Sequence, residues 1–141
     1  MKIPGIVCAA AMIIGLFLLV TPASAHHSFA AEWDGSNCRE FTGILTKLDW
    51  QNPHPYFYAD IKNAAGKVES NTFQLSSPSN LKRGGAKYSV LTENIGKTVV
   101  IRGCASRNGT DRRYAGEYIK LADGTVQRTG QDVEGIFGTA R

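Results

Sequence analysis

The N-terminal segment constrains the fold of this chain more than any other feature of the sequence. Lys2 is followed by an apolar run from Ile6 to Val20, and small residues then lead to Ala23-Ser24-Ala25. The run has roughly 15 residues, fewer than the roughly 20 that span the hydrocarbon core of a bilayer. With the Ala-x-Ala pattern after it, the segment predicts a cleaved secretory signal peptide over residues 1–25. An uncleaved membrane anchor is the alternative.

Cleavage after Ala25 would leave a short exported chain. About 116 of the 141 residues remain, which is enough for one modest hydrophobic core. We therefore expect a periplasmic or secreted protein that meets a membrane only during export. Loss of Lys2 lowers the formal net charge from +4 to +3. Such a mild charge favours solubility and, together with export, argues against nucleic acid as a partner.

Two cysteines, Cys38 and Cys104, remain in the mature chain. An even pair in an exported protein predicts a disulfide bond. By the chain-entropy argument, closing a loop of this length stabilises the fold by roughly 4 kcal/mol. A thiolate metal site is the alternative, but the close Cys-x-x-Cys spacing typical of such sites is missing.

The hydrophobic pattern predicts five strands and one short helix. Runs typical of strands cover Glu40–Trp50, Tyr56–Lys62, Val68–Leu75, Lys97–Ala105 and Tyr114–Leu121. Gly43, near the start of the first run, predicts a bulge or a sharp bend. Between the third and fourth runs, the serines, Pro78 and the glycine pair of Ser76–Gly85 predict a capped helix.

This element order is that of an OB-like fold, so the predicted class is all-β with a small five-stranded Greek-key barrel. An open β-sandwich fragment is the alternative. The first and fourth strands of such a barrel pair antiparallel, which would place Cys38 beside Cys104. The predicted organisation is a signal peptide (1–25), an N-terminal arm (26–39), the barrel (40–124) and a loosely packed C-terminal tail (125–141).

Three motifs carry a resemblance to a known family. They are Ala25-His26-His27-Ser28-Phe29-Ala30, Gly43-x-x-x-Lys47-x-x-Trp50-x-Asn52-Pro53-His54 and Ser77-Pro78-x-x-Leu81-x-Arg83-Gly84, and the late Asp123-Gly124 adds to them. On these residues the chain resembles the DUF6152 family of small exported bacterial proteins. The resemblance implies export and a small β domain, and it implies no activity. Gly85-Ala86 stands where the family typically has an aromatic residue, which argues against an aromatic contact from that loop.

All three histidines fall in two short stretches and suggest a copper site. Cleavage after Ala25 would free the α-amino group of His26, whose amine and imidazole could chelate Cu(II) with His54 as a further ligand. His27 could replace either histidine, and Glu32, Asp34 or a tyrosine could add a weak axial oxygen. In the alternative interpretation, His26 and His27 are ordinary residues beside a cleavage site, and His54 only hydrogen-bonds a backbone carbonyl and so fixes its loop.

A second hypothesis is a binding module without a metal. OB-like folds bind ligands through the loops between their first and second and their fourth and fifth strands. Here those loops combine aromatic and polar residues with arginines, namely Trp50, Asn52, Tyr56, Arg107, Arg112 and Arg113. Such side chains could stack on and pair with a small anionic molecule or a glycan, or contact a protein partner. The alternative is a solvated arginine turn.

Catalysis is the least favoured class of function. The sequence contains no nucleophile elbow, no paired carboxylates and no phosphate-binding loop. We therefore predict no catalytic residue.

Overall fold

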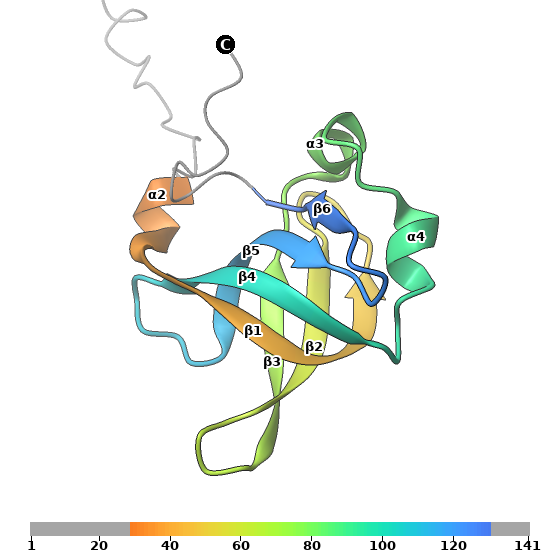
Figure 1. Ribbon diagram of the computed structural model, residues 1–141. Helices are drawn as coiled ribbons and strands as arrows, with labels where there is room; N and C mark the ends of the chain where they lie inside the picture. Colours follow the sequence, from red (N-terminus) through yellow and green to blue (C-terminus); the bar gives the residue numbers. More distant parts are fainter. Residues whose placement is uncertain (1–28, 131–141) are drawn as a thin grey trace, which may run out of the picture.

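The computed structural model describes residues 29–130, so the expected signal peptide, His26, His27 and the end of the expected tail lie outside the described residues. Figure 1 shows a small barrel with short helices at its upper end. Its elements are α2 (Phe29–Glu32), β1 (Trp33–Asp49), β2 (Tyr56–Lys62), β3 (Val68–Gln74), α3 (Pro78–Arg83), α4 (Tyr88–Thr92), β4 (Thr98–Ser106), β5 (Arg113–Lys120) and β6 (Val126–Arg128). None of the helices within this range is long and apolar enough to cross a membrane.

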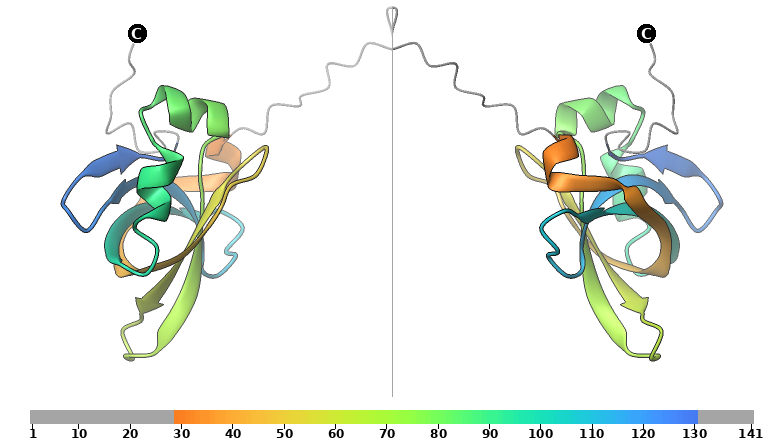
Figure 2. Two further views of the ribbon diagram at one scale, coloured as in Figure 1. Left: turned by 90° about the vertical axis from the view of Figure 1, so that its right-hand side faces the viewer. Right: turned by 90° about the vertical axis from the view of Figure 1, so that its left-hand side faces the viewer.

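The sheet closes on itself, which confirms the predicted OB-like barrel. Its strands follow the order β3-β2-β1-β4-β5-β6, and a further pairing joins β3 to β5. This closing pair is parallel, with Thr72 opposite Arg113 and Phe73 opposite Tyr114. Five strands form the closed barrel, and β6 extends it beside β5. The β2–β3 hairpin projects beyond the barrel at the end opposite α3, as both views in Figure 2 show.

The side chains of β1 alternate between the core and the solvent, and a bulge in this strand keeps Leu48 in the core. Phe41, Leu45 and Leu48 point inward and are buried. A shift in register between Leu45 and Lys47 leaves two consecutive exposed residues there, after which Leu48 faces the core again. The bulge therefore lies three residues after Gly43, where the strand turns across the barrel.

Three aromatic rings fill the middle of the barrel. Phe41 lies 5.3 Å from Phe73 and 4.4 Å from Tyr114 between ring centroids, and Phe73 lies 5.4 Å from Tyr114. These rings come from β1, β3 and β5. Their contacts therefore hold the two strands of the parallel closing pair against the longest strand.

Beyond shifts of one or two residues at element ends, the structure differs from the expected one at four points. The first is helix α2, which the sequence pattern does not predict. β1 begins at Trp33 and not at Glu40, so residues 33–39 of the expected arm belong to the barrel. A second helix, α4, follows α3. Its N-cap, Lys87, makes no side-chain capping hydrogen bond, so the usual start signal of a helix is missing from the sequence there. Part of the expected tail forms β6, a strand of only three residues.

Gly43 has a different role from the expected one. It lies between Ile61 of β2 and Val99 of β4, in the middle of the sheet. A Cβ atom at this position would contact the carbonyl oxygen of Asp60 and would lie 2.8 Å from Ile61 Cγ1. The glycine is therefore required for the close approach of β2.

We expect Gly43→Ala to destabilise the protein by about 1–3 kcal/mol, because the added methyl group forces the β2 backbone away. Gly84→Ala is the matched control, since Gly84 has a φ of −75° and its added Cβ would have its nearest neighbour at 3.4 Å. Urea denaturation followed by circular dichroism measures both variants. Equal midpoints for the two variants would contradict the close-approach explanation.

Candidate functional site

An open hollow of about 430 Å³ lies beside the end of β1; we call it the Trp50 pocket. It is lined by Trp50, Pro78, Ser79, Lys82, Ala86, Lys87 and Tyr88. The rings of Trp50 and Tyr88 meet edge to face, with centroids 5.2 Å apart and planes at 68°. Both lysines are exposed, and the described lining contains no carboxylate. The pocket thus combines aromatic walls with positive charge.

Two buried leucines hold the helices that form this pocket. Leu81 fixes α3 and Leu91 fixes α4 on the barrel core. The backbone between the helices turns at Gly85, whose φ of +87° favours glycine. Gly85 belongs to the Gly85-Ala86 pair, from which the sequence predicts no aromatic contact. The aromatic contact with Trp50 comes instead from Tyr88, which is 51% exposed.

The loop between β1 and β2 is attached to the end of β3. His54 Nδ1 lies 3.2 Å from the carbonyl oxygen of Leu75, and the Leu75 N–H donates to the carbonyl oxygen of Pro55 at 2.9 Å. Because a carbonyl only accepts, the first contact requires a proton on Nδ1 and leaves the lone pair on Nε2. Asn52 is exposed and precedes a cis peptide bond to Pro53.

Arg113 and Tyr56 both donate hydrogen bonds to the side-chain amide of Gln74. Arg113 Nη2 donates to Gln74 Oε1 at 3.0 Å, and the Tyr56 hydroxyl donates to the same oxygen at 3.3 Å. The guanidinium also pairs with Glu32 Oε1 at 2.7 Å and lies 5.1 Å from the centre of the Trp33 ring. Arg113 therefore ties α2 and the start of β1 to the barrel.

The two other predicted ligand-binding arginines lie elsewhere. Arg107 Nε donates to the carbonyl oxygen of Trp33 at 3.0 Å, which supports the start of β1. Arg112 is exposed and pairs with Asp111 at 3.4 Å. The structure thus groups Tyr56 with Arg113, and it places Trp50 in a pocket whose described lining contains none of the predicted arginines.

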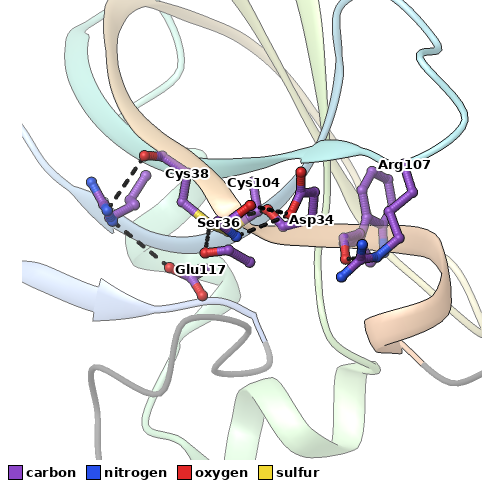
Figure 3. The surroundings of a disulfide bond; sticks show 9 residues. Asp34, Ser36, Cys38, Cys104, Arg107 and Glu117 are labelled. Atoms are coloured by element: carbon purple, nitrogen blue, oxygen red, sulfur yellow. Dashed lines mark hydrogen bonds and ion pairs between the residues drawn. A yellow bond between two sulfur atoms is a disulfide. The ribbon is translucent and has the colours of Figure 1, made fainter.

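The predicted disulfide between Cys38 and Cys104 is present, with an S–S distance of 2.03 Å. The two residues lie directly opposite each other in the β1–β4 pair. Figure 3 shows Glu117 of β5 beside this bond. The Glu117 side chain is fully buried, and its Oε2 lies 3.8 Å from Arg102 Nε. The sequence analysis missed Glu117; its only signal was a lone carboxylate inside an apolar strand.

Residues Asp34–Asn37 form an arch over the exposed side of the disulfide, at the register shift between Trp33 and Cys38. Asp34 Oδ1 accepts hydrogen bonds from Ser36 Oγ at 2.7 Å and from Ser36 N at 3.0 Å. These bonds, the side-chain one first, lower the pKa of the Asp34 carboxyl below its ordinary value. Cys38 is half-buried, with its sulfur 3.6 Å from the carbonyl oxygen of Asp34 and 3.4 Å from that of Gly35 in the arch, whereas Cys104 is fully buried.

A family model for a family of unknown function, DUF6152, matches residues 15–114. The chain belongs to this family. No curated protein and no solved structure matches the chain. Because the function of DUF6152 is unknown, membership assigns no role to any residue, and the roles considered below depend on the geometry alone.

Within the described part of this DUF6152 chain, one group of at least three potential metal ligands lies close together. It consists of Cys38, Cys104 and Glu117, whose ligand atoms all lie within 4.8 Å of one another. His54 belongs to no such group among residues 29–130. A copper site at His54 would therefore need ligands from outside the described range.

We expect Ser36→Ala to raise the pKa of Asp34 toward its ordinary value, because the variant removes the stronger of the two hydrogen bonds. The native pKa is depressed, so the arch gains stability from Asp34 above the unfolded-state pKa of about 3.9 and loses it as the pH falls through the folded value. Carboxyl-carbon NMR titration measures the shift. Asp123, whose pKa is lowered by Thr125, is the internal control and should not move. An unchanged Asp34 pKa would contradict this assignment.

Proposed function

We propose that this protein is exported and binds a small organic anion, an aromatic or apolar carboxylate, in the Trp50 pocket. The observation that carries the proposal is the chemistry of the lining, in which the rings of Trp50 and Tyr88 lie beside two exposed lysines. An apolar wall with a few polar groups that fix orientation is typical of small-molecule sites. The volume of about 430 Å³ falls within their usual range.

The aromatic residues and the lysines of the pocket would contribute differently to ligand binding. A flat ligand can stack on Trp50 and Tyr88, and burial of its apolar surface supplies most of the binding free energy. Lys82 and Lys87 are solvated, so each pairing with a carboxylate adds only about 0.2–1 kcal/mol. The lysines therefore select the charge and orientation of the ligand. Because the pocket is open, we expect a dissociation constant on the order of 0.1–1 mM.

The first test uses 2-naphthoate as the probe and the uncharged 2-naphthalenemethanol as its matched control. We expect 2-naphthoate to shift the Trp50 indole N–H signal in ¹⁵N NMR spectra and to bind more tightly than the alcohol. Tyr88→Ala should weaken both ligands, because it removes a stacking ring. The double variant Lys82→Gln/Lys87→Gln should weaken only the carboxylate. Lys67→Gln, in the remote β2–β3 hairpin, is the control for net charge.

Two results would contradict this function. One is equal affinity for the acid and the alcohol in the native protein. The other is a set of shifted signals that excludes Trp50 and the helices α3 and α4.

Copper binding is the second candidate, and the Nδ1 contact of His54 favours it. Metal-bound histidines usually direct their other ring nitrogen to a carbonyl or carboxylate, as His54 does to Leu75. The loop before β2 and α2 both lie at the upper end of the barrel in Figure 1. His26 precedes Phe29 by three residues, a reach of roughly 10 Å in an extended chain. If His54 lies within that reach, the N-terminal amine and imidazole of His26 complete a site with it.

Cu(II) titration of the processed protein, followed by electron paramagnetic resonance, tests this candidate. Mass spectrometry first checks that the chain begins at His26. We expect His26→Ala and His54→Ala each to weaken binding at least roughly tenfold, with Gln51→Ala as the loop control. Retained affinity in both histidine variants, or equal binding by the unprocessed chain, would contradict a shared copper site.

A further inference from the structure

The disulfide and the carboxylate beside it contain three atoms that could bind a metal ion once the disulfide is reduced. Both cysteine sulfurs and one carboxylate oxygen of Glu117 lie within 4.8 Å of one another. They come from three neighbouring strands, β1, β4 and β5, so the sheet itself holds them together (Figure 3). The fold thus places Glu117 beside the two predicted partners Cys38 and Cys104, a proximity that the sequence did not predict.

The charge balance at this position depends on the redox state. While the disulfide is intact, the Glu117 carboxylate and the Arg102 guanidinium, 3.8 Å apart, sum to zero. Two thiolates would add two negative charges, which the Arg102–Glu117 pair leaves unbalanced because its own charges already cancel. Buried charge without compensation is strongly unfavourable. The dithiolate form therefore requires a cation, and one dication restores neutrality.

The geometry suits a small thiophilic dication. Zinc binds thiolate sulfur at about 2.3 Å and carboxylate oxygen at about 2.0–2.2 Å, usually in a tetrahedron. Reduction would release the two sulfurs from their 2.03 Å bond and let side-chain rotation separate them around an ion. Two thiolates and one carboxylate would leave the fourth position to water. Sulfur ligands also discriminate against Mg²⁺ and Ca²⁺.

We propose that reduction of the Cys38–Cys104 bond by a small dithiol creates a Zn²⁺ site formed by Cys38, Cys104 and Glu117. The dithiol transfers two electrons and two protons to the bond, giving two protein thiols, and becomes a disulfide itself. Zn²⁺ then replaces the two thiol protons, which pass to the solvent. Cys38 is the point of attack, because it is the half-buried residue of the pair, whereas Cys104 and Glu117 are fully buried.

The test uses the purified chain processed to begin at His26, which no longer carries Cys8. It is reduced with dithiothreitol, freed of reductant without oxygen, and titrated with Co²⁺ as a spectroscopic substitute. We expect a sulfur-to-cobalt charge-transfer band in the near ultraviolet that saturates at one ion per chain and is abolished by Zn²⁺. The oxidised protein should give no such band. Because only thiolates produce the band, cobalt bound to histidines at the N-terminus does not contribute to it.

Single variants test the contribution of each proposed metal ligand. Cys38→Ser should reduce the band to about half its intensity, because it removes one of the two sulfurs. Glu117→Gln should weaken the affinity at least roughly tenfold, and Glu69→Gln in the β2–β3 hairpin is the matched control. Circular dichroism checks that each variant folds. A reduced native protein without the band overturns the proposal, as does unchanged affinity in a folded Glu117→Gln variant.

Discussion

The antiparallel pairing of β1 with β4 is the contact on which the rest of the structure depends. It brings Cys38 opposite Cys104, and the disulfide stabilises this pairing by roughly 4 kcal/mol. Because β5 lies on the other side of β4, the same pairing places Glu117 next to the bond. At its far end, β1 bends at the bulge, and Trp50, which follows the strand, lies against α3 and α4. Both candidate binding regions are therefore positioned by one long strand.

The barrel could be predicted from the sequence because its signals are local. Alternating apolar residues mark most strands, and the cysteine pair agrees with the antiparallel pairing of the first and fourth strands in an OB-like barrel. The first part of β1 gave no such signal. Asp34–Asn37 is polar and lacks alternation, and it joins the sheet only at an irregular register. Strand β6 also forms by backbone pairing, with Tyr118–Lys120 of β5. Its own three residues carry no pattern that predicts this pairing.

The candidate sites were less predictable, because their partners are distant in sequence. Trp50 was identified by type, but the ring beside it and the lysines around it come from helices whose placement depends on Leu81 and Leu91. The arginines of the β4–β5 segment suggested a ligand site, yet Arg113 pairs with Glu32 and Gln74. An arginine that lies near a carboxylate such as that of Glu32 forms a structural ion pair. Composition alone does not distinguish such an arginine from one that binds a ligand.

The proposed zinc site also bears on how the barrel would survive reduction. Opening the disulfide removes the covalent link between β1 and β4, and with it roughly 4 kcal/mol, a large part of the 5–15 kcal/mol that a typical domain possesses. An ion held by Cys38 and Cys104 would join the same two strands through coordinate bonds, and Glu117 would add β5 to the link. Since an ion that binds only the folded state stabilises it, the free energy of metal binding would become folding free energy. Reduction without metal would instead leave Arg102 and Glu117 beside two neutral thiols, in a barrel closed only by backbone pairing and its aromatic core.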